Sequence, residues 1–257
     1  MRPNHREYPP PPTLKHAIKC IWTDKIEPDA LTSTFDILPD GCAEIIFHFN
    51  GSCATATHRL PSPFVMGLLT EPVTLQAQGQ LTILAIRCYP WAVFSLLGLP
   101  AGSDNIRIID HPLARLQDTL ARCIDADRVE EAIHHLVQGL RQVQAPADSM
   151  LARAGAAMCE AHGTLPVHAV AAAAHATVRT LERRFKQSSG RTVKEVSGVM
   201  RFEQVRNALF AQPQTSIAGL ASTLGYADQS HLSREFRRYA GTTPAAFAQR
   251  LVGFVQA

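Results

Sequence analysis

The chain has 257 residues, of which 46% are hydrophobic and 18% are charged, and its formal net charge is +3. This length allows two modest domains or one large one, and the chain can bury a core without disulfide staples. Its six cysteines form no CxxC pair and no regular spacing, which argues against a zinc site and against a disulfide framework.

The charge is unevenly distributed along the chain. Residues 1–147 contain 12 Lys and Arg against 15 Asp and Glu, whereas residues 148–257 contain 13 against 7. The two formal charges are therefore −3 and +6. A slightly acidic N-terminal half and a basic C-terminal half are typical of a sensor joined to a nucleic-acid binder, because contacts with phosphates need cations.

The sequence predicts no targeting or membrane-spanning segment. Its first residues, MRPNHREYPPPP, lack the apolar stretch of a signal peptide, and no apolar run approaches the roughly 18 residues that cross a bilayer. We therefore expect a cytoplasmic protein with no membrane partner.

Short apolar runs in the front half predict β-strands. The dipeptide Asp40-Gly41 between two of these runs is a hairpin signal. Glycines and prolines between the runs favour a small barrel or sandwich up to about residue 110, with an interior that could hold a ligand. The runs are FDILPD, EIIFHF, FVMGLL, VTLQAQ and LTILAIRC.

Cys42, Glu44, His48 and Cys53 are close enough in sequence to raise a metal hypothesis. Glu44 and His48 are an even number of residues apart and would share one face of a strand. A metal cage needs three or more converging ligands, however, and a His-x-His spacing is missing. We therefore predict no metal and no cofactor.

Two helices are predicted after the strands, at residues 112–124 and at about 126–142. In the second helix, apolar residues such as Val129, Leu136 and Leu140 recur every three or four positions. This stripe fits either a coiled-coil seam between two copies or a face that packs on its own domain. A short polar linker at 143–149 follows.

Residues 217–244, IAGLASTLGYADQSHLSREFRRYAGTTP, predict a helix, a tight turn and a second helix. Ile217, Leu220 and Leu224 give the first helix one apolar face. Gly225 supplies the left-handed conformation that ends this helix sharply.

The second helix of this unit begins at the N-cap residue Asp228 and carries Leu232, Phe236 and Tyr239 on one stripe, which packs against the first helix. The other face offers amide, hydroxyl and guanidinium groups that suit base edges and phosphates. Its residues are Gln229, Ser230, Ser233, Arg234, Arg237 and Arg238. A solvated basic helix is the alternative interpretation.

An internal repeat argues against that alternative. The core residues Leu181 and Phe185 lie 51 positions before Leu232 and Phe236, and the N-cap residue Thr177 lies 51 positions before the second N-cap. A match in caps, core, turn and charge indicates two helix-turn-helix units with two recognition helices.

The segment LGYADQSHLSREFRRYAGTTPAAF, preceded by TVRTLERRFKQSSG and by Arg201-Phe202, resembles the AraC/XylS family of bacterial transcription regulators. The first unit departs from the family pattern before its cap, where HAVAAAAHA replaces the usual small residues and glycine. Upstream, LPDGCAEIIFHF and RCYPWAVFSLLGLPA resemble the N-terminal region of one branch of the family, whose sensor is a small cupin-like β-barrel.

This resemblance implies an α+β protein of two domains. A sensor and dimerisation domain is expected at residues 1–142, and an all-α DNA-binding domain at 150–257 with units at about 166–187 and 217–239. One helix, from Thr192 to about residue 211, should join the units over on the order of 30 Å, which suits major grooves about 34 Å apart.

The resemblance also implies roles for single residues and partners. Base-facing residues are expected at Arg179, Glu182, Arg183, Gln229, Ser230, Ser233 and Arg234. Lys186, Arg237 and Arg238 are expected on the DNA backbone, where they position the protein without specifying sequence. The implied partners are double-stranded DNA, RNA polymerase, an unknown small-molecule effector and a second copy of the chain.

Two functions from other classes were weighed against a regulator. A DNA-repair methyl acceptor of the Ada type needs an activated cysteine thiolate in a Pro-Cys-His-Arg or zinc-bound setting, and the sequence has no such motif. A metal-dependent cupin enzyme fused to a DNA-binding module needs a ligand set that is missing. We therefore predict a regulator and not an enzyme.

Overall fold

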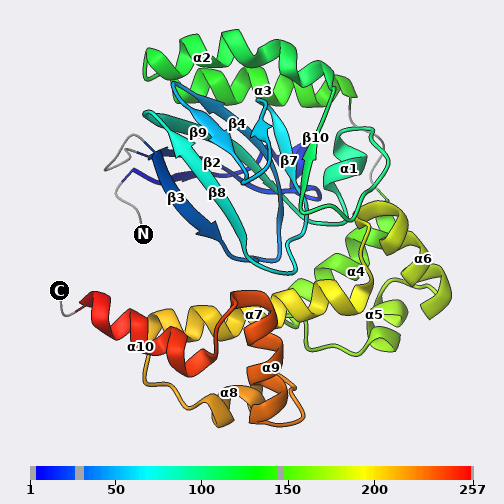
Figure 1. The fold of residues 1–257 in the computed structure, drawn as a ribbon. Coiled ribbons are helices and arrows are strands. Elements are labelled where there is room, and N and C mark those ends of the chain that lie inside the picture. The colour runs from blue at the N-terminus through cyan, green and yellow to red at the C-terminus, as the bar shows by residue number, and fades with distance from the viewer. Residues whose placement is uncertain (1–3, 27–31, 144–147, 256–257) are drawn as a thin grey trace.

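The computed structural model describes residues 4–26, 32–143 and 148–255. The strands and helices of the front half form one body, and a group of helices from the back half lies beneath it (Figure 1). The predicted α+β organisation, with a β-sheet domain followed by an all-α domain, is confirmed.

The front half folds into two antiparallel sheets. The six-stranded sheet has the order β1-β2-β9-β4-β7-β10, and the four-stranded sheet has the order β3-β8-β5-β6. The strands are β1 (Arg6–Tyr8), β2 (Ile18–Ile26), β3 (Thr32–Ile37), β4 (Ala43–Phe49), β5 (Ser52–Ala54), β6 (Arg59–Leu60), β7 (Phe64–Met66), β8 (Val73–Gln78), β9 (Leu81–Cys88) and β10 (Ile106–Ile108).

The central strands β4 and β9 are buried on both faces. Ile45 and Leu84 belong to a core shared with the helices, whereas Ile46 and Ile83 belong to a second core between the two sheets. Burial on both sides explains why these strands are nearly continuous apolar runs in the sequence and do not alternate with polar residues.

The hairpin predicted at Asp40-Gly41 is wrong. β3 pairs with β8, whereas β4 pairs with β7 and β9, so the two strands that flank this turn lie in different sheets. The turn itself is tight, with a φ of +74° at Gly41. A short-range turn signal does not tell which sheet the next strand joins, and here the chain crosses from one sheet to the other.

Helices cover the six-stranded sheet (Figure 1). The apolar stripe of α3 packs there, and Leu136 and Leu140 are 0% exposed in the single chain. Leu136 and Leu140 therefore pack within their own domain, whereas Val129 and Ile133 of the same stripe are half-buried. Dimerisation through this helix stays a prediction. The helical segments are η1 (Pro12–Leu14), α1 (Val93–Leu96), η2 (Pro112–Leu116), α2 (Gln117–Asp125) and α3 (Val129–Val143).

The back half is helical. Of the linker expected at 143–149, residues 144–147 lie outside the described residues, and Asp148 caps α4 by accepting from the amide of Met150. No described helix combines the length and the apolar character needed to span a bilayer. The helices are α4 (Ser149–Glu160), α5 (Val167–Ala173), α6 (Val178–Ser189), α7 (Val193–Ala211), α8 (Ile217–Thr223), α9 (Gln229–Ala240) and α10 (Pro244–Val255).

The two tight turns share one geometry but differ in length. His175 in the first unit and Gly225 in the second both have positive φ, +53° and +70°. In each turn the next amide, of Ala176 or Tyr226, donates to a carbonyl five residues back. The second turn then has one additional residue, Ala227, before its cap, so the repeat offset changes from 50 to 51 inside the turn.

The joining helix α7 connects both units through Arg201. The Arg201 guanidinium donates to the Gly163 carbonyl at 2.9 Å and forms an ion pair with Glu235 of α9 at 3.3 Å. It also lies over the Tyr226 ring, 5.3 Å from its centroid. One side chain therefore contacts the loop before the first unit, the turn of the second unit and the second recognition helix.

The two halves of the chain contact each other through Trp91. Its side chain is 4% exposed and lies 5.9 Å from the Phe185 ring of α6. A Cβ atom added at Gly155 in α4 would lie 2.1 Å from the indole, so only glycine fits there. Arg191 adds a hydrogen bond of 2.7 Å to the Ser103 carbonyl. Trp91 is thus a core residue that joins the two halves.

Two glycine substitutions test the turn of the second unit. We expect Gly225→Ala to destabilise the protein by about 1–2 kcal/mol, because its backbone is left-handed. Its added Cβ would have an ordinary 3.9 Å contact with Thr164, so strain and not a clash is tested. Gly219→Ala in α8 is the matched control and should stabilise by about 1 kcal/mol. Denaturant unfolding measures both, and equal effects would contradict this geometry.

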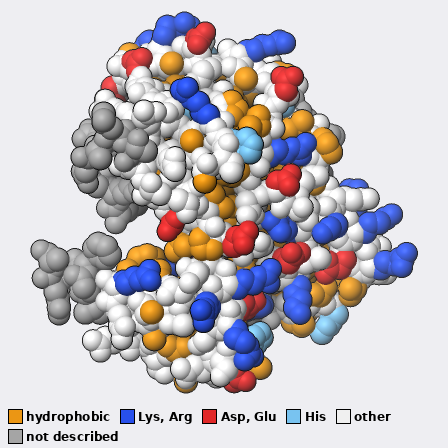
Figure 2. Space-filling model, in the orientation of Figure 1, with side chains coloured by type: hydrophobic (Ala, Val, Ile, Leu, Met, Phe, Trp, Pro, Cys, Tyr) orange, Lys and Arg blue, Asp and Glu red, His pale blue; other side chains and the backbone are white. Residues whose placement is uncertain are grey.

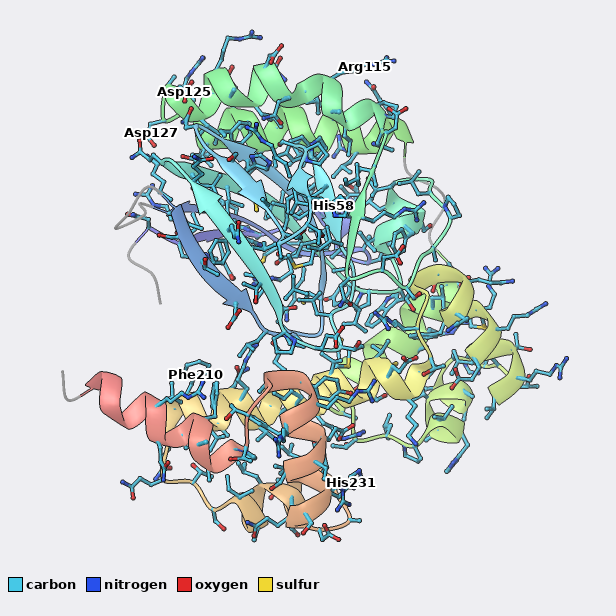
Figure 3. The ribbon with its side chains drawn as sticks, viewed as in Figure 1. His58, Arg115, Asp125, Asp127, Phe210 and His231 are labelled. Atoms are coloured by element: carbon cyan, nitrogen blue, oxygen red, sulfur yellow. The ribbon has the colours of Figure 1, made fainter. Side chains whose placement is uncertain are left out.

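A second pair of variants tests the Arg201 network. Arg201→Met should cost about 3 kcal/mol, because it leaves the Glu235 carboxylate, whose side chain is 17% exposed, without its cation. Arg115→Met is the control, since Arg115 points outward from the front half (Figure 3) and should change stability by no more than about 0.5 kcal/mol. Similar unfolding curves for the two variants would show that the network contributes nothing.

Candidate nucleic-acid interface and interior cavity

The two recognition helices begin with side-chain caps. The Thr177 hydroxyl accepts from the amide of Thr180 at 3.2 Å at the start of α6, and the Asp228 carboxylate accepts from the amide of His231 at 2.6 Å at the start of α9. His231 also closes the second turn, because its Nδ1 accepts from the amide of Ala227 (Figure 3). These caps hold the first turn of each helix, which carries candidate base-facing residues.

Most of the residues expected at DNA are exposed on these helices. Figure 2 shows Lys and Arg side chains projecting from the side of the molecule where α6 lies. Within the described residues, no ion pair forms at Arg179, Arg183, Lys186, Arg234 or Arg237, and Arg238 lies over the Tyr239 ring. The exposed candidates are Arg179, Arg183, Lys186, Gln229, Ser230, Arg234, Arg237 and Arg238, whereas Ser233 is half-buried.

Glu182 lies elsewhere than we expected. Its side chain is half-buried, and its carboxylate accepts a hydrogen bond of 3.2 Å from the amide of Val193. Val193 is the first residue of α7, where free amides and the positive end of the helix dipole favour an anion. The carboxylate thus fixes α6 against the start of the joining helix, a contact that the helix periodicity of α6 alone could not indicate.

Sequence reasoning overlooked one exposed apolar residue at the interface. Val178 occupies the first position of α6 and is 42% exposed. An exposed aliphatic side chain at the start of a recognition helix can contact a thymine methyl group. The preceding cap residue Thr177 was the available signal, because it places Val178 in the first turn.

The front half contains a cavity of about 320 Å³ between the two sheets. Aromatic and aliphatic side chains form most of its lining, including Phe35, Phe64 and Leu75. Glu44 and His48 both line it, as their shared strand face predicts. Cys42 instead lines a cleft between the two halves of the chain.

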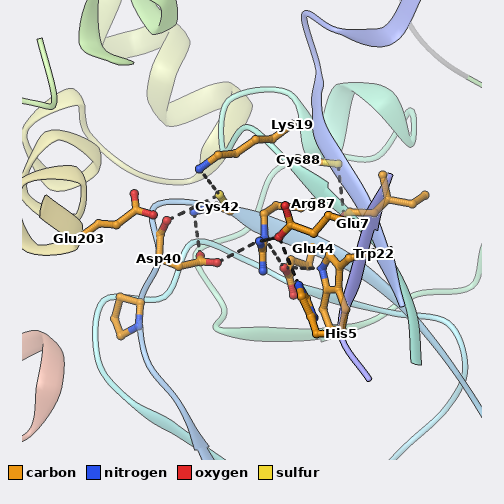
Figure 4. Close-up of polar contacts among 12 residues, drawn as sticks. His5, Glu7, Lys19, Trp22, Asp40, Cys42, Glu44, Arg87, Cys88 and Glu203 are labelled. Carbon is orange, nitrogen blue, oxygen red and sulfur yellow. Dashed lines mark hydrogen bonds and ion pairs between the residues drawn. The ribbon is translucent and has the colours of Figure 1, made fainter. Parts of the chain in front are cut away.

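A polar cluster closes one end of the cavity (Figure 4). The buried Glu44 carboxylate accepts from Trp22 Nε1 at 3.0 Å and from Arg87 Nε at 2.9 Å. Arg87 also pairs with Glu7 at 3.1 Å and with Asp40 at 3.5 Å. Burial and the nearby Asp40 carboxylate raise the pKa of Glu44 above its ordinary value.

The four residues weighed as metal ligands do not gather at one point. Cys53 lines the cavity with Glu44 and His48, but in the described part of the chain the one group of three or more possible ligands with all atoms within 4.8 Å of one another is Cys123, Glu131 and His135. These three are in α2 and α3, away from the cavity.

The turn between β3 and β4 touches both the cavity and the joining helix. Its Asp40 lines the cavity, and the Asp40 carboxylate accepts from the amide of Cys42 at 3.0 Å. Its Pro39 carbonyl accepts from Arg206 of α7 at 2.9 Å, and a Cβ added at Gly41 would lie 3.4 Å from the Glu203 carboxylate. A five-residue segment therefore connects the cavity between the sheets with the helix that carries both units.

Two family models match the chain. One, described as a helix-turn-helix domain, matches residues 170–250, and the other, described as a domain of unknown function (DUF6597), matches residues 6–109. No curated protein was found to match the chain.

Several solved structures are similar to the chain. ToxT from Vibrio cholerae O395 is 10% identical, with 91% of this chain and 98% of that chain covered and a TM-score of 0.45. The DNA-binding domain of AdpA in complex with a target DNA is 25% identical, with 42% and 96% covered and a TM-score of 0.38. The C-terminal domain of AraT, a response regulator from Geobacillus stearothermophilus, is 20% identical, with 41% and 88% covered and a TM-score of 0.38.

The family match begins inside α5 and spans α6, the joining helix α7, and α8 and α9. The C-terminal half of this chain is therefore a helix-turn-helix domain of the AraC type.

Proposed function

We propose that the chain is a sequence-specific DNA-binding transcription regulator that places α6 and α9 in adjacent major grooves. The supporting observation is a pair of capped helices, each of 12 residues with an exposed basic face, joined by one helix. The 19 residues of α7 span about 28 Å, close to the roughly 34 Å between successive major grooves on one side of B-DNA.

Direct base contacts are assigned to exposed side chains of the two helices. Guanidinium groups suit guanine, and the Gln229 amide suits adenine. The base-reading residues are Arg179 and Arg183 in the first unit and Gln229, Ser230, Ser233 and Arg234 in the second. Lys186, Arg237 and Arg238 are assigned to phosphates, which set position and affinity but not sequence.

Glu182 is assigned a positioning role in place of base reading. Its carboxylate accepts from the amide of Val193, so it orients α6 on α7. The base-facing set then contains no acidic residue. A carboxylate in that set would be repelled by the DNA phosphates.

The front half is assigned the role of a sensor that modulates DNA binding. We divide the chain into a sensor at residues 1–142, a linker at 143–149 and the DNA-binding domain at 150–257. Support comes from the cavity and from the turn whose Asp40 lines it and whose Pro39 contacts Arg206 of α7. RNA polymerase and a second copy of the chain stay predicted partners.

The cysteine chemistry favours a regulator over a methyl acceptor. A methyl acceptor needs a thiolate, which a lowered pKa supplies. Burial instead raises the pKa of the Cys53 thiol to about 11, and it raises that of Cys42 well above the ordinary value.

Selection of binding sites from randomised DNA tests the base-reading residues. We expect a site with two halves, in which Arg183→Ala loses about 1–3 kcal/mol of base preference in one half and Arg234→Ala loses as much in the other. Arg237→Ala is the control and should weaken binding to all sequences and flatten the salt dependence. The proposal is wrong if the wild-type chain selects no sequence.

Variants of Glu182 test its positioning role. Glu182→Gln retains an oxygen for the amide of Val193, whereas Glu182→Ala should lose about 1 kcal/mol of stability. Both should keep the base preference of the wild-type chain, because the side chain does not face DNA. A shift toward adenine at one base pair in Glu182→Gln would instead assign base reading to this residue.

A further inference from the structure

The cavity between the sheets has the size of a small-molecule site. Its volume of about 320 Å³ lies at the lower end of the range usual for ligand pockets, roughly 300–1,000 Å³. Most of its wall is apolar, with Ile46, Phe64, Met66, Leu75 and Ile83 facing it. Such a wall favours a ligand with a compact apolar body.

Three N–H groups at the polar end of the cavity already donate to carboxylates. The Trp22 indole N–H and the Arg87 Nε–H both donate to Glu44, and Arg87 Nη1 donates to Glu7. A ligand with a carboxylate head group would compete for Arg87 with Glu44 of β4 and Glu7 of β1. Both already accept hydrogen bonds from its guanidinium.

The acceptors of the cavity are in excess. At the polar end three carboxylates, those of Glu7, Asp40 and Glu44, pair with one guanidinium, that of Arg87. These four groups have a formal charge of −2 when all three carboxylates are ionised, and since burial raises the pKa of Glu44 to about 7, that state prevails at about pH 8. The interior therefore attracts a cation.

His48 adds an acceptor that lacks a donor. Its Nε2 lies 3.2 Å from the Leu60 carbonyl oxygen, which can only accept, so Nε2 carries the proton. Burial lowers the pKa of His48, which keeps the ring neutral and leaves Nδ1 as an acceptor. Nδ1 is buried and has no hydrogen-bond partner within the described residues. Buried acceptors in proteins are normally hydrogen-bonded, so His48 Nδ1 is an acceptor that a donor would satisfy.

We propose that the cavity binds a small amphipathic amine, whose apolar body fills the space between the sheets and whose ammonium group donates to Glu44. An ammonium group supplies a positive charge and N–H donors that the Glu44 carboxylate can accept. The rings of Trp22, Phe35 and Phe64 add faces that attract a cation. The regulatory consequence of this binding rests on the function proposed above.

Three compounds with one phenylbutyl body test the head group. We would titrate the full chain by calorimetry at about pH 8, where an alkylamine is charged, with 4-phenylbutylamine, 4-phenylbutan-1-ol and 5-phenylpentanoate. The amine should bind at least about tenfold more tightly than the alcohol, because its head forms charge-assisted hydrogen bonds, and the carboxylate should bind least.

Variants separate the charge of the cavity from its shape. Glu44→Gln should reduce the affinity for the amine to that for the alcohol and leave the alcohol unchanged. Asp118→Asn, which removes one exposed carboxylate on α2, is the matched control and should behave as wild type. Ile83→Trp should fill the cavity and abolish binding of all three compounds, with thermal melting confirming that each variant is folded.

Two outcomes would overturn the proposal. One is a carboxylate that binds as tightly as the amine, and the other is a folded Glu44→Gln variant that still prefers the amine. DNA binding by the same samples is measured separately: loss of sequence-specific binding in the ligand-free wild type would contradict the proposed function alone. An amine that binds the cavity without changing DNA affinity would contradict only the regulatory consequence.

Discussion

The placement of both recognition helices depends on how α7 is held. At its start, a capping box joins Thr192 and Glu195, and Glu182 of α6 accepts from the first amide of the helix. In its middle, Arg201 pairs with Glu235 of α9. Each unit is thus fixed to the same rod by a buried or half-buried carboxylate, so their separation is set by hydrogen bonds and not by a flexible linker.

The same rod is the surface on which the front half rests. Arg206 on α7 donates to the Pro39 carbonyl, and Arg191 just before α7 donates to the Ser103 carbonyl. Trp91 fills the space above Gly155, where no side chain fits. A change at the polar end of the cavity can therefore reach α7 through two residues, Asp40 and Pro39, which are adjacent in the chain.

The helical half was largely predictable because its signals are local. Caps, glycine in the turn and apolar residues at helical spacing gave the two units and the joining helix from short stretches of sequence. His175 was not foreseen in its left-handed conformation, since a histidine there is strained and only the surrounding helices impose it.

The front half shows why the rest could not be predicted. The Asp40-Gly41 turn predicted a hairpin, but strand partners are chosen by contacts distant in sequence, such as the pairing of β3 with β8. The α3 stripe fitted two interpretations, and the burial of Leu136 and Leu140 depends on contacts with the rest of the front half that no local pattern specifies. The Glu44–Arg87 pair joins residues 43 positions apart, so no local pattern indicates it.

The most direct test of a rigid pair of recognition helices is to change the spacing of the two half-sites in DNA. Inserting five base pairs rotates one half-site by about half a turn of the double helix, away from the second recognition helix. Our account predicts that the affinity of a single chain then falls to that for a single half-site. Unchanged affinity for the inserted site would contradict it, because the two units would then move independently of α7.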